Sequence, residues 1–323
     1  MKTSLLFLLL INIFSFIIFG FFPELYIALP ILILGFAIFS FYQCIKVFKR
    51  IENKKEFLIY SIALTSIFLC IIYIVEIRWS INPFGMIDAY AMWVGKGRVI
   101  ALGILNEDPI PLWNSYWRMP NYPLGIPFLH ANVSIVFPET ETFLTLIKLP
   151  NYFFLFIVYI FLLGRVLSIK HKYGKIIFLL VSGVFLFQPN YLLVNSDLCA
   201  DFPVSVLLAL VTYFLLELNE KKTIVWLILT AALLINVKSE ALIISFISLI
   251  FMFGLLFSNK ENLFKPFLLS LFLVAIFASP TWYLIAKGSF LSTDFKDVSK
   301  STFQIEFLFN RIFNKDVWTL IIK

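Results

Sequence analysis

The chain has 323 residues, of which 61% are hydrophobic and only 14% are charged, against about 25% charged residues in typical soluble domains. The composition excludes an ordinary soluble protein and indicates a polytopic protein surrounded by a lipid bilayer. The formal net charge of +7 comes from Lys and Arg clustered in short stretches between apolar runs, not from a basic face with interleaved aromatics. This pattern excludes nucleic acid as the partner.

The first 22 residues, "MKTSLLFLLLINIFSFIIFGFF", carry the early Lys and the apolar core of a signal peptide. Their apolar part is too long for the hydrophobic region of a signal peptide, and the stretch lacks an A-x-A cleavage site. We therefore interpret it as an uncleaved first span.

Apolar runs of roughly 17–25 residues, the length that crosses about 30 Å of hydrocarbon, recur along most of the chain. They predict an all-α fold, a transmembrane bundle of nine helices forming a single domain over residues 1–323. The candidate spans are 4–22, 25–45, 57–77, 143–166, 176–194, 202–218, 223–237, 241–257 and 266–286.

Four connecting stretches carry Lys or Arg and define the orientation: 46–56, 165–175, 217–222 and 258–265. The positive-inside rule places them in the cytoplasm, together with Lys2. The spans then alternate correctly only if "PLGIPFLHANVSIVF" (123–137) does not cross, so we expect a re-entrant or surface helix at the outer interface. The long loop 78–142 and the tail 287–323 face the outside.

The three cysteines, Cys44, Cys70 and Cys199, lie inside or at the ends of apolar segments without Cys-x-x-Cys spacing. We interpret them as structural, because free Cys is often buried. No His/Cys/carboxylate cluster has the spacing of metal ligands, so neither a metal nor a cofactor is expected.

The first polar cluster lies in the outer loop, in "GMIDAYAMWVGKGRVIALG" (85–103), where Asp88 precedes Trp93, Lys96 and Arg98. The segment is typical of a short amphipathic interfacial helix, with Trp93 and Trp113 as anchors at the level of the headgroups. A plain solvated loop is the alternative.

Further along the same loop, "NYPLGIPFLHA" (121–131) contains Tyr122 and His130. Its Pro and Gly residues predict a bent entry into a helix. For His130 a structural role is weighed against metal binding or acid–base catalysis, and the structural role is favoured.

Two more clusters fall on the outer side under this topology. Asp197 and Asp201 bracket the start of a span, and a carboxylate at that depth requires water, a cavity or a cation. In "NVKSEA" (236–241), Lys238 and Glu240 interrupt an apolar stretch, where a simple turn is the alternative. We interpret the gathering of these charges on one membrane face as a shared cavity.

The order of these segments resembles the membrane-embedded C-type glycosyltransferase (GT-C) superfamily, in its bacterial branch that uses polyprenyl-phosphate sugars and is related to dolichyl-phosphate-mannose-type mannosyltransferases. The matching pieces are "DAYAMWVGKGR", "NYPLGIPFLHA", "ADFPVSVLLAL" and "NVKSEAL", which span residues 85–242. Members tend to be longer, and "DVWTLIIK" ends as an apolar run begins, so C-terminal spans are expected to be missing.

The resemblance implies sugar transfer from a polyprenyl-phosphate donor to a hydroxyl of a glycan, lipid or protein acceptor, at the outer face of the bacterial cytoplasmic membrane. It implies an acidic base in the first outer loop, and Asp88 is the residue that matches. A base accepts the proton of the acceptor hydroxyl, and cations stabilise the leaving phosphate. The residues expected to bind substrate are Lys96, Arg98, Trp93, Tyr122, Asp201, Lys238 and Glu240.

Two other functions fit a polytopic chain. A lipid or solute transporter predicts inverted repeats and charges at the bilayer midplane, whereas these charges lie at span ends and in one long loop. A non-catalytic assembly subunit would use the loop as a docking surface. Sugar transfer in detergent discriminates between the three.

Overall fold

A computed structural model of the chain describes residues 2–49, 53–81, 93–107, 123–217, 221–238, 241–258, 266–272 and 274. Every regular element in these ranges is helical, which confirms the all-α class for the part of the chain described. The elements are α1 (Lys2–Phe21), the 3-10 helix η1 (Pro23–Ile27), α2 (Ala28–Lys49), α3 (Lys54–Ile81), α4 (Gly95–Leu105), α5 (Gly125–Val136), α6 (Thr140–Leu146), α7 (Leu149–Ser168), α8 (Lys172–Leu186), α9 (Pro189–Ser196), α10 (Asp201–Leu216), α11 (Lys221–Val237) and α12 (Ala241–Ser258).

Local sequence signals set several helix boundaries. The Asn53 side chain accepts a hydrogen bond from the Glu56 backbone N–H at 3.1 Å and donates to the Glu56 carboxylate at 3.2 Å, so Asn53 caps the beginning of α3. Pro23 and Pro189 stand in the first turns of η1 and α9, where a missing N–H costs nothing.

One predicted span is not a continuous helix. The segment 176–194 was expected to form a single helix, but the structure divides it between α8 and α9. Gln188 adopts an extended backbone (φ −61°, ψ 134°) immediately before Pro189, because the proline ring disfavours helical geometry in the residue that precedes it.

Two helical runs are long and apolar enough to cross a membrane, Lys54–Ile81 with 28 residues and Thr140–Ser168 with 29. They contain the predicted spans 57–77 and 143–166. The other apolar helical stretches found among the described residues are shorter, between 10 and 17 residues, and include parts of α1, α2 and α12. The crossing of nine segments therefore stays a prediction.

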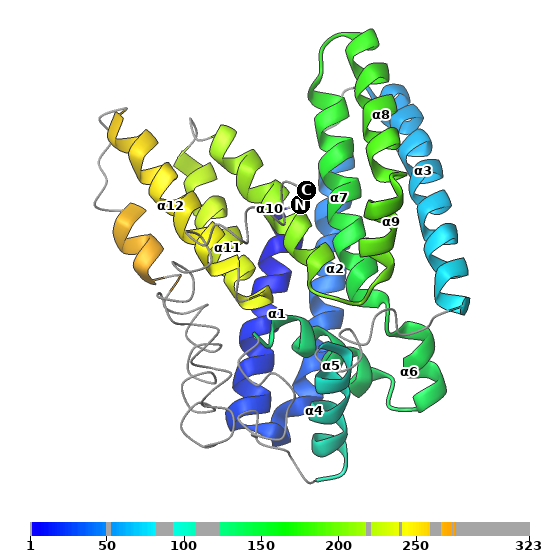
Figure 1. The fold of residues 1–323 in the computed structure, drawn as a ribbon, viewed down its shortest axis with the longest axis vertical. Helices are drawn as coiled ribbons and strands as arrows, with labels where there is room; N and C mark the ends of the chain where they lie inside the picture. Colours follow the sequence, from blue (N-terminus) through cyan, green and yellow to red (C-terminus); the bar gives the residue numbers. More distant parts are fainter. Residues whose placement is uncertain are drawn as a thin grey trace, which may run out of the picture.

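The helices lie in two groups around α1 and α2 (Figure 1). α10, α11 and α12 pack on one another on one side, and α3, α7, α8 and α9 form the other side. α3, α9 and α11 end where α7 and α10 begin, and we call this the lower end, as drawn in Figure 1. The opposite end, where α3 and α8 begin and α7 and α10 finish, is the upper end.

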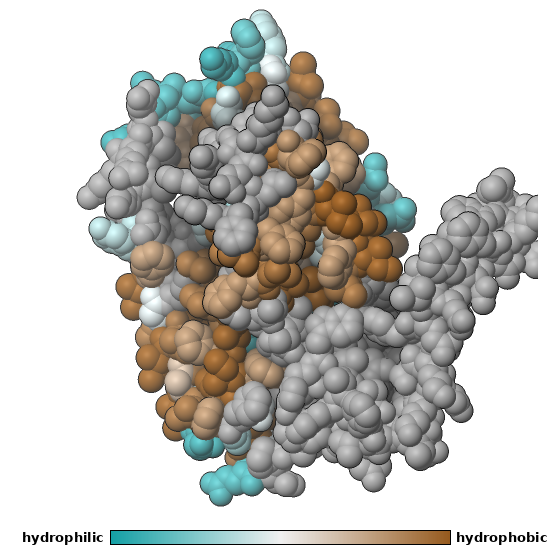
Figure 2. Space-filling view, turned by 90° about the vertical axis from the view of Figure 1, so that its left-hand side faces the viewer, coloured by the Kyte–Doolittle hydropathy of each residue, from teal (hydrophilic) through white to brown (hydrophobic). Residues whose placement is uncertain are grey.

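Large apolar side chains cover much of the outer surface. On α3, Ile62 and Tyr73 expose 58% and 67% of their surface, and on α8 Leu180 and Val184 expose 65% and 70%. Figure 2 shows hydrophobic residues across the middle of the face in view, with most of the visible hydrophilic residues near the upper and lower ends. Exposed apolar surface on this scale is typical of a membrane-facing or partner-facing protein.

α4 and α5 form a tightly packed pair at the lower end, which corrects the expectation for 123–137. Ten of the twelve residues of α5 are buried, so it is not a surface helix. α5 packs against α1, α2, α7 and α11 as well as α4, which leaves the re-entrant alternative.

Two glycines permit this packing. A Cβ atom on Gly97 of α4 would lie 2.6 Å from both the His130 Cβ and the Pro127 carbonyl oxygen of α5. A Cβ atom on Gly125 would lie 2.4 Å from the Asn236 carbonyl oxygen at the end of α11. Both glycines let backbones approach more closely than any side chain allows.

We expect Gly125→Ala to destabilise the protein by about 1–3 kcal/mol or more, because the added methyl group forces two backbones apart. Gly164→Ala is the matched control, since a Cβ atom at Gly164 in α7 meets nothing within 4 Å. Thermal unfolding of both variants in detergent measures the difference. Equal transition temperatures would contradict this close approach of α5 to α11.

Candidate functional site

Ion pairs at the lower end join helices that are far apart in sequence. Arg78 of α3 contacts Asp197 after α9 at 3.1 Å, and Lys238 after α11 contacts Asp201 of α10 at 2.6 Å. At the same end, Lys148 contacts Glu76 of α3.

The upper end carries the remaining ion pairs found among the described residues. Glu56 of α3 contacts Lys175 of α8, and Arg165 of α7 contacts Glu217 after α10 at 2.9 Å. These residues belong to the stretches 46–56, 165–175 and 217–222, which the sequence predicts on one side of the membrane. The two ends of the bundle thus carry different sets of ion pairs, and the membrane topology stays a prediction.

Asp201 and Lys238 are both predicted site residues. Of the three ion pairs described at the lower end, theirs is the most exposed. Asp201 begins α10, where the helix dipole favours a carboxylate, and 55% of its side chain is exposed. Lys238 follows α11 directly and exposes 24% of its side chain. An exposed pair of this kind contributes only about 0–1 kcal/mol to stability, so its loss is tolerable for the fold.

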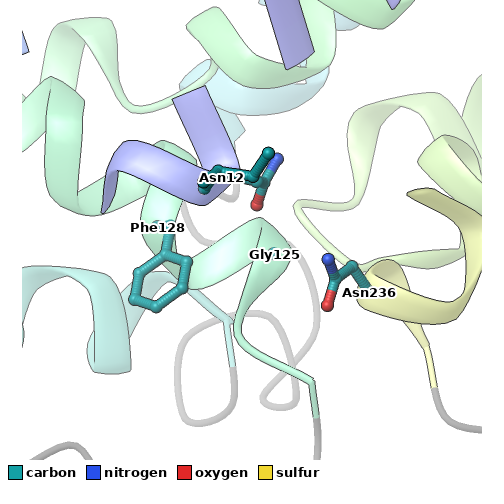
Figure 3. Close-up of a pocket in the computed structure, with 5 residues that line it drawn as sticks. Asn12, Gly125, Phe128 and Asn236 are labelled. Atoms are coloured by element: carbon teal, nitrogen blue, oxygen red, sulfur yellow. The ribbon is translucent and has the colours of Figure 1, made fainter. Parts of the chain in front are cut away.

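A small crevice lies where α1, α5 and the end of α11 meet (Figure 3), and Asn236 in its lining precedes Lys238 by two residues. Asn12 of α1, Gly125 and Phe128 of α5, and Asn236 of α11 line about 10 Å³ of space, comparable with what one water molecule needs. The Asn12 side chain donates to the Leu8 carbonyl at 2.8 Å, while its own buried oxygen has no hydrogen-bond partner. The crevice therefore offers an acceptor for one small polar group.

These contacts bring together the four segments that the sequence singles out. "NVKSEAL" touches "ADFPVSVLLAL" through Lys238 and Asp201, and it touches "NYPLGIPFLHA" where Asn236 meets Gly125. The described part of "DAYAMWVGKGR" packs on "NYPLGIPFLHA" through Gly97. The four pieces form one continuous region at the lower end, although up to about 150 residues of chain separate them.

The structure corrects the surroundings of Trp93. The residue was expected at the headgroup level or against a sugar ring, but its side chain is only 2% exposed and packs in the apolar core. As it stands, Trp93 contributes to the packing of the loop and offers no open aromatic face.

Arg98 is likewise engaged within the protein. Its guanidinium donates to the Ser134 hydroxyl at 2.5 Å and to the Pro138 carbonyl at 2.8 Å, and it lies 4.7 Å from the centre of the Phe143 ring. Arg98 therefore ties α4 to the end of α5 and to α6.

Lys96 is buried, with 4% of its surface exposed, instead of lying on a solvated helix face. α4 has 11 residues, too few to cross a bilayer, so Lys96 belongs to the loop region. Burial lowers the pKa of the Lys96 ammonium from about 10.5 to about 7. Near neutral pH, this side chain exists as a mixture of charged and neutral forms.

The low pKa of Lys96 makes stability depend on pH. As the pH falls from about 10 to about 7, the unfolded chain gains a proton at Lys96 and the folded chain does not, so the free energy of unfolding decreases. At about 1.4 kcal/mol per pKa unit, the penalty reaches several kcal/mol. We expect Lys96→Met to remove this decrease, as measured by thermal unfolding between pH 7 and pH 10. Parallel pH profiles for wild type and variant would show that an anionic partner holds the ammonium charged.

His130 lies completely buried in α5. Burial lowers its pKa to about 3, which keeps the imidazole neutral at physiological pH. Both ring nitrogens are buried without a hydrogen-bond partner among the described residues, so the structural role of His130 stays a prediction.

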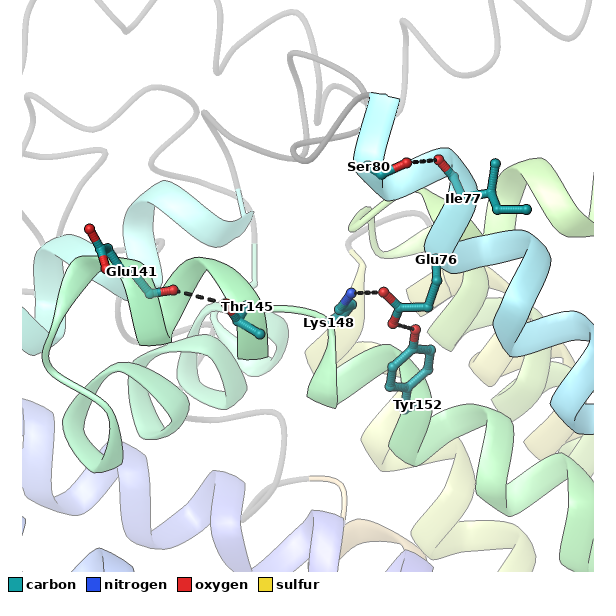
Figure 4. Close-up of polar contacts among 7 residues, drawn as sticks. All are labelled: Glu76, Ile77, Ser80, Glu141, Thr145, Lys148 and Tyr152. Carbon is teal, nitrogen blue, oxygen red and sulfur yellow. Dashed lines mark hydrogen bonds and ion pairs between the residues drawn. The ribbon is translucent and has the colours of Figure 1, made fainter.

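A second polar network was not predicted (Figure 4). Glu76 of α3 accepts hydrogen bonds from Lys148 and from the Tyr152 hydroxyl, both near the start of α7, and Lys148 also lies 5.6 Å from the Trp79 ring. Both carboxylate oxygens of Glu76 are occupied, so the network joins α3 to α7. The signal was present, because a carboxylate inside an apolar helix requires a partner.

Asp197 forms a separate set of contacts with the same two helices, α3 and α7. Only 10% of its side chain is exposed, its carboxylate accepts from Arg78, and its backbone carbonyl accepts from Asn151 at 2.9 Å. Burial raises the pKa of Asp197, and the Arg78 guanidinium opposes that rise. The residue therefore anchors the end of α9 between α3 and α7.

Three predicted site residues, Asp88, Tyr122 and Glu240, lie outside the described residues. Within the described part of the chain, no group of three or more His, Cys, Asp or Glu residues is arranged to hold a metal ion. No family model, curated protein or solved structure matches the chain.

Proposed function

We propose that this protein is a membrane glycosyltransferase that moves a sugar from a polyprenyl-phosphate donor to an acceptor hydroxyl at the lower end of the bundle. The observation that carries the proposal is the accessible contact between Asp201 and Lys238, at 2.6 Å, where the segments "ADFPVSVLLAL" and "NVKSEAL" meet. It supports a shared polar site beside the outer loop.

In this proposal, the acceptor hydroxyl oxygen attacks the anomeric carbon of the donor sugar. The bond from that carbon to the phosphate oxygen breaks, and the electron pair leaves with the polyprenyl phosphate. Asp88 takes the hydroxyl proton as general base. Lys238 stabilises the charge that develops on the leaving phosphate, and Asp201 orients its ammonium group.

The other predicted residues divide into three groups. Tyr122 and Glu240 stay predicted substrate contacts from the same segments. Trp93 and Arg98 support the site by holding the loop in place, because their side chains are buried or bonded within the protein. Lys96 supplies a second ammonium with a pKa near the physiological range.

The proposed location is the bacterial cytoplasmic membrane, crossed several times, with the lower end facing outward. Two helices long enough to cross a membrane support membrane association, and the Lys and Arg residues in the connecting stretches at the upper end support this orientation. The acceptor is a glycan, lipid or protein, and the donor chain lies in the bilayer.

Labelling of introduced cysteines tests the orientation. We expect positions 170–174, at the upper end between α7 and α8, to react only with membrane-permeant reagents in intact cells. Positions 105–107, at the end of α4, should react with impermeant reagents. External labelling at 170–174 would reverse the orientation and remove the proposed site from the outer face.

Sugar transfer tests the function itself. Purified protein in detergent, given a polyprenyl-phosphate sugar and candidate acceptors, should release free polyprenyl phosphate in amounts that equal the sugar transferred. Donor movement across vesicles without chemistry would favour the transporter alternative. If the protein shows neither transfer nor transport but binds another envelope protein stably, the assembly subunit is favoured.

A further inference from the structure

A second candidate site lies among α7, α8 and α10 and plays no part in the proposed chemistry. These helices enclose a groove of about 430 Å³, and Tyr191 of α9 also lines it. Its lining is apolar except for three hydroxyl groups, and includes Leu162, Val181, Phe185, Tyr191, Ser205 and Ala209.

The groove faces outward from the bundle. Leu162 and Leu186 form buried parts of its wall, whereas Val181 and Phe185 on α8 expose 63% and 60% of their surface at its rim. If the protein lies in a bilayer, as proposed above, this opening meets lipid. At about 430 Å³, the groove has room for part of an acyl chain.

Tyr191 gives this groove a chemical preference. Its hydroxyl is buried and has no hydrogen-bond partner, and its ring packs 5.8 Å from Phe202 and 6.0 Å from Phe185, measured between ring centres. A buried hydroxyl without a partner is destabilising, and an acceptor oxygen on an occupant would remove that cost. Phe185 is largely exposed, so a chain that displaces its side chain can reach the hydroxyl.

The position of Tyr191 fits the polar end of a lipid chain. It lies on α9 six residues before Asp197, about 9 Å along a helix, and Asp197 marks the charged lower end.

We propose that this groove is a binding site for one ester-linked acyl chain of a glycerophospholipid, with the Tyr191 hydroxyl donating to the ester carbonyl. Such an oxygen sits at the head of an acyl chain, beside the hydrocarbon. A polyprenyl phosphate carries no ester carbonyl at the corresponding point. The phospholipid therefore matches the lining and the hydroxyl together.

Photolabelling of the full chain tests the site. The protein is reconstituted in vesicles of phosphatidylethanolamine and phosphatidylglycerol with a phosphatidylcholine probe that carries a diazirine on one acyl chain. We expect labels to concentrate on residues 178–186 and 205–210. Ala209→Phe, which fills the groove, should reduce this labelling about tenfold, and Tyr191→Phe by about twofold to tenfold, the value of one hydrogen bond.

Leu69→Phe on the exposed face of α3 is the matched control and should leave groove labelling unchanged, since Leu69 is 60% exposed outside the groove. The proposal is overturned if the groove residues are labelled no more strongly than α3 and if Ala209→Phe does not change that labelling. Competition by polyprenyl phosphate with no effect of Tyr191→Phe would overturn the assignment to phospholipid. If alkaline carbonate extracts the chain from the membrane, membrane embedding itself is refuted. None of these measurements depends on sugar transfer.

Discussion

Replacing Asp88 with Asn is expected to lower the turnover of sugar transfer by about 10²–10⁴-fold, the usual contribution of a general base. The amide has nearly the same shape as the carboxylate but cannot accept the proton of the acceptor hydroxyl. Asp88 is the only carboxylate within 85–103, and the following part of its segment packs against the loop region that meets "NVKSEAL". Turnover and thermal stability are measured on the same purified variant.

Glu141→Gln provides the control for this experiment. It makes the same change of carboxylate to amide on an exposed residue of α6, at the same end of the protein. It should leave turnover near the wild-type value. Wild-type turnover in the Asp88→Asn variant would exclude Asp88 as the base and move the search to Asp201, the accessible carboxylate beside Lys238.

The approach of Asp201 to Lys238 was predictable in outline from the sequence. Alternating basic loops and apolar runs place both residues at the same end of adjacent helices, and the helices on which they lie pack together. The contact distance itself depends on the register between α10 and α11. That register is set by side-chain packing along both helices, which hydropathy alone does not contain.

The environment of the outer loop was the least predictable feature. Trp93 and Lys96 have the composition of an interfacial helix, and an isolated helix would place them at the surface. The structure buries both because Gly97 lets α4 lie directly against α5. Such burial is a tertiary effect, since it depends on a partner helix about thirty residues later in the chain.

Two other differences between the prediction and the structure could have been foreseen from the sequence. The break between α8 and α9 follows from Pro189, and a stricter use of the rule for residues before proline predicts it. Glu76 lies inside a predicted span, where a charged side chain requires a partner, but the sequence offers more than one cation as that partner. Only the packing of α3 on α7 selects Lys148 and Tyr152.

Lys238→Ala is expected to lower turnover with a polyprenyl-phosphate donor by about 10²–10³-fold, comparable to the loss of one positioned group that stabilises transition-state charge. Its ammonium is held at 2.6 Å from Asp201 and exposes 24% of its side chain, so the variant removes an accessible charge and leaves the core unchanged. Thermal stability should change by no more than about 1 kcal/mol.

Arg165→Gln is the control matched to this change, because it breaks another accessible ion pair, with Glu217, at the upper end of the bundle. Equal losses of turnover in the two variants would mean that both ion pairs affect activity by stabilising the fold. Lys238 would then be part of a simple turn without a role in catalysis. The exchanged variant, Asp201→Lys with Lys238→Asp, restores the ion pair with its charges reversed. If Lys238 stabilises the leaving phosphate, the exchanged variant should recover thermal stability and stay inactive, because the ammonium then lies on the wrong side of the pair. Recovery of turnover in the exchanged variant would show that the ion pair serves to hold α10 against α11, and that the phosphate charge is stabilised by another cation.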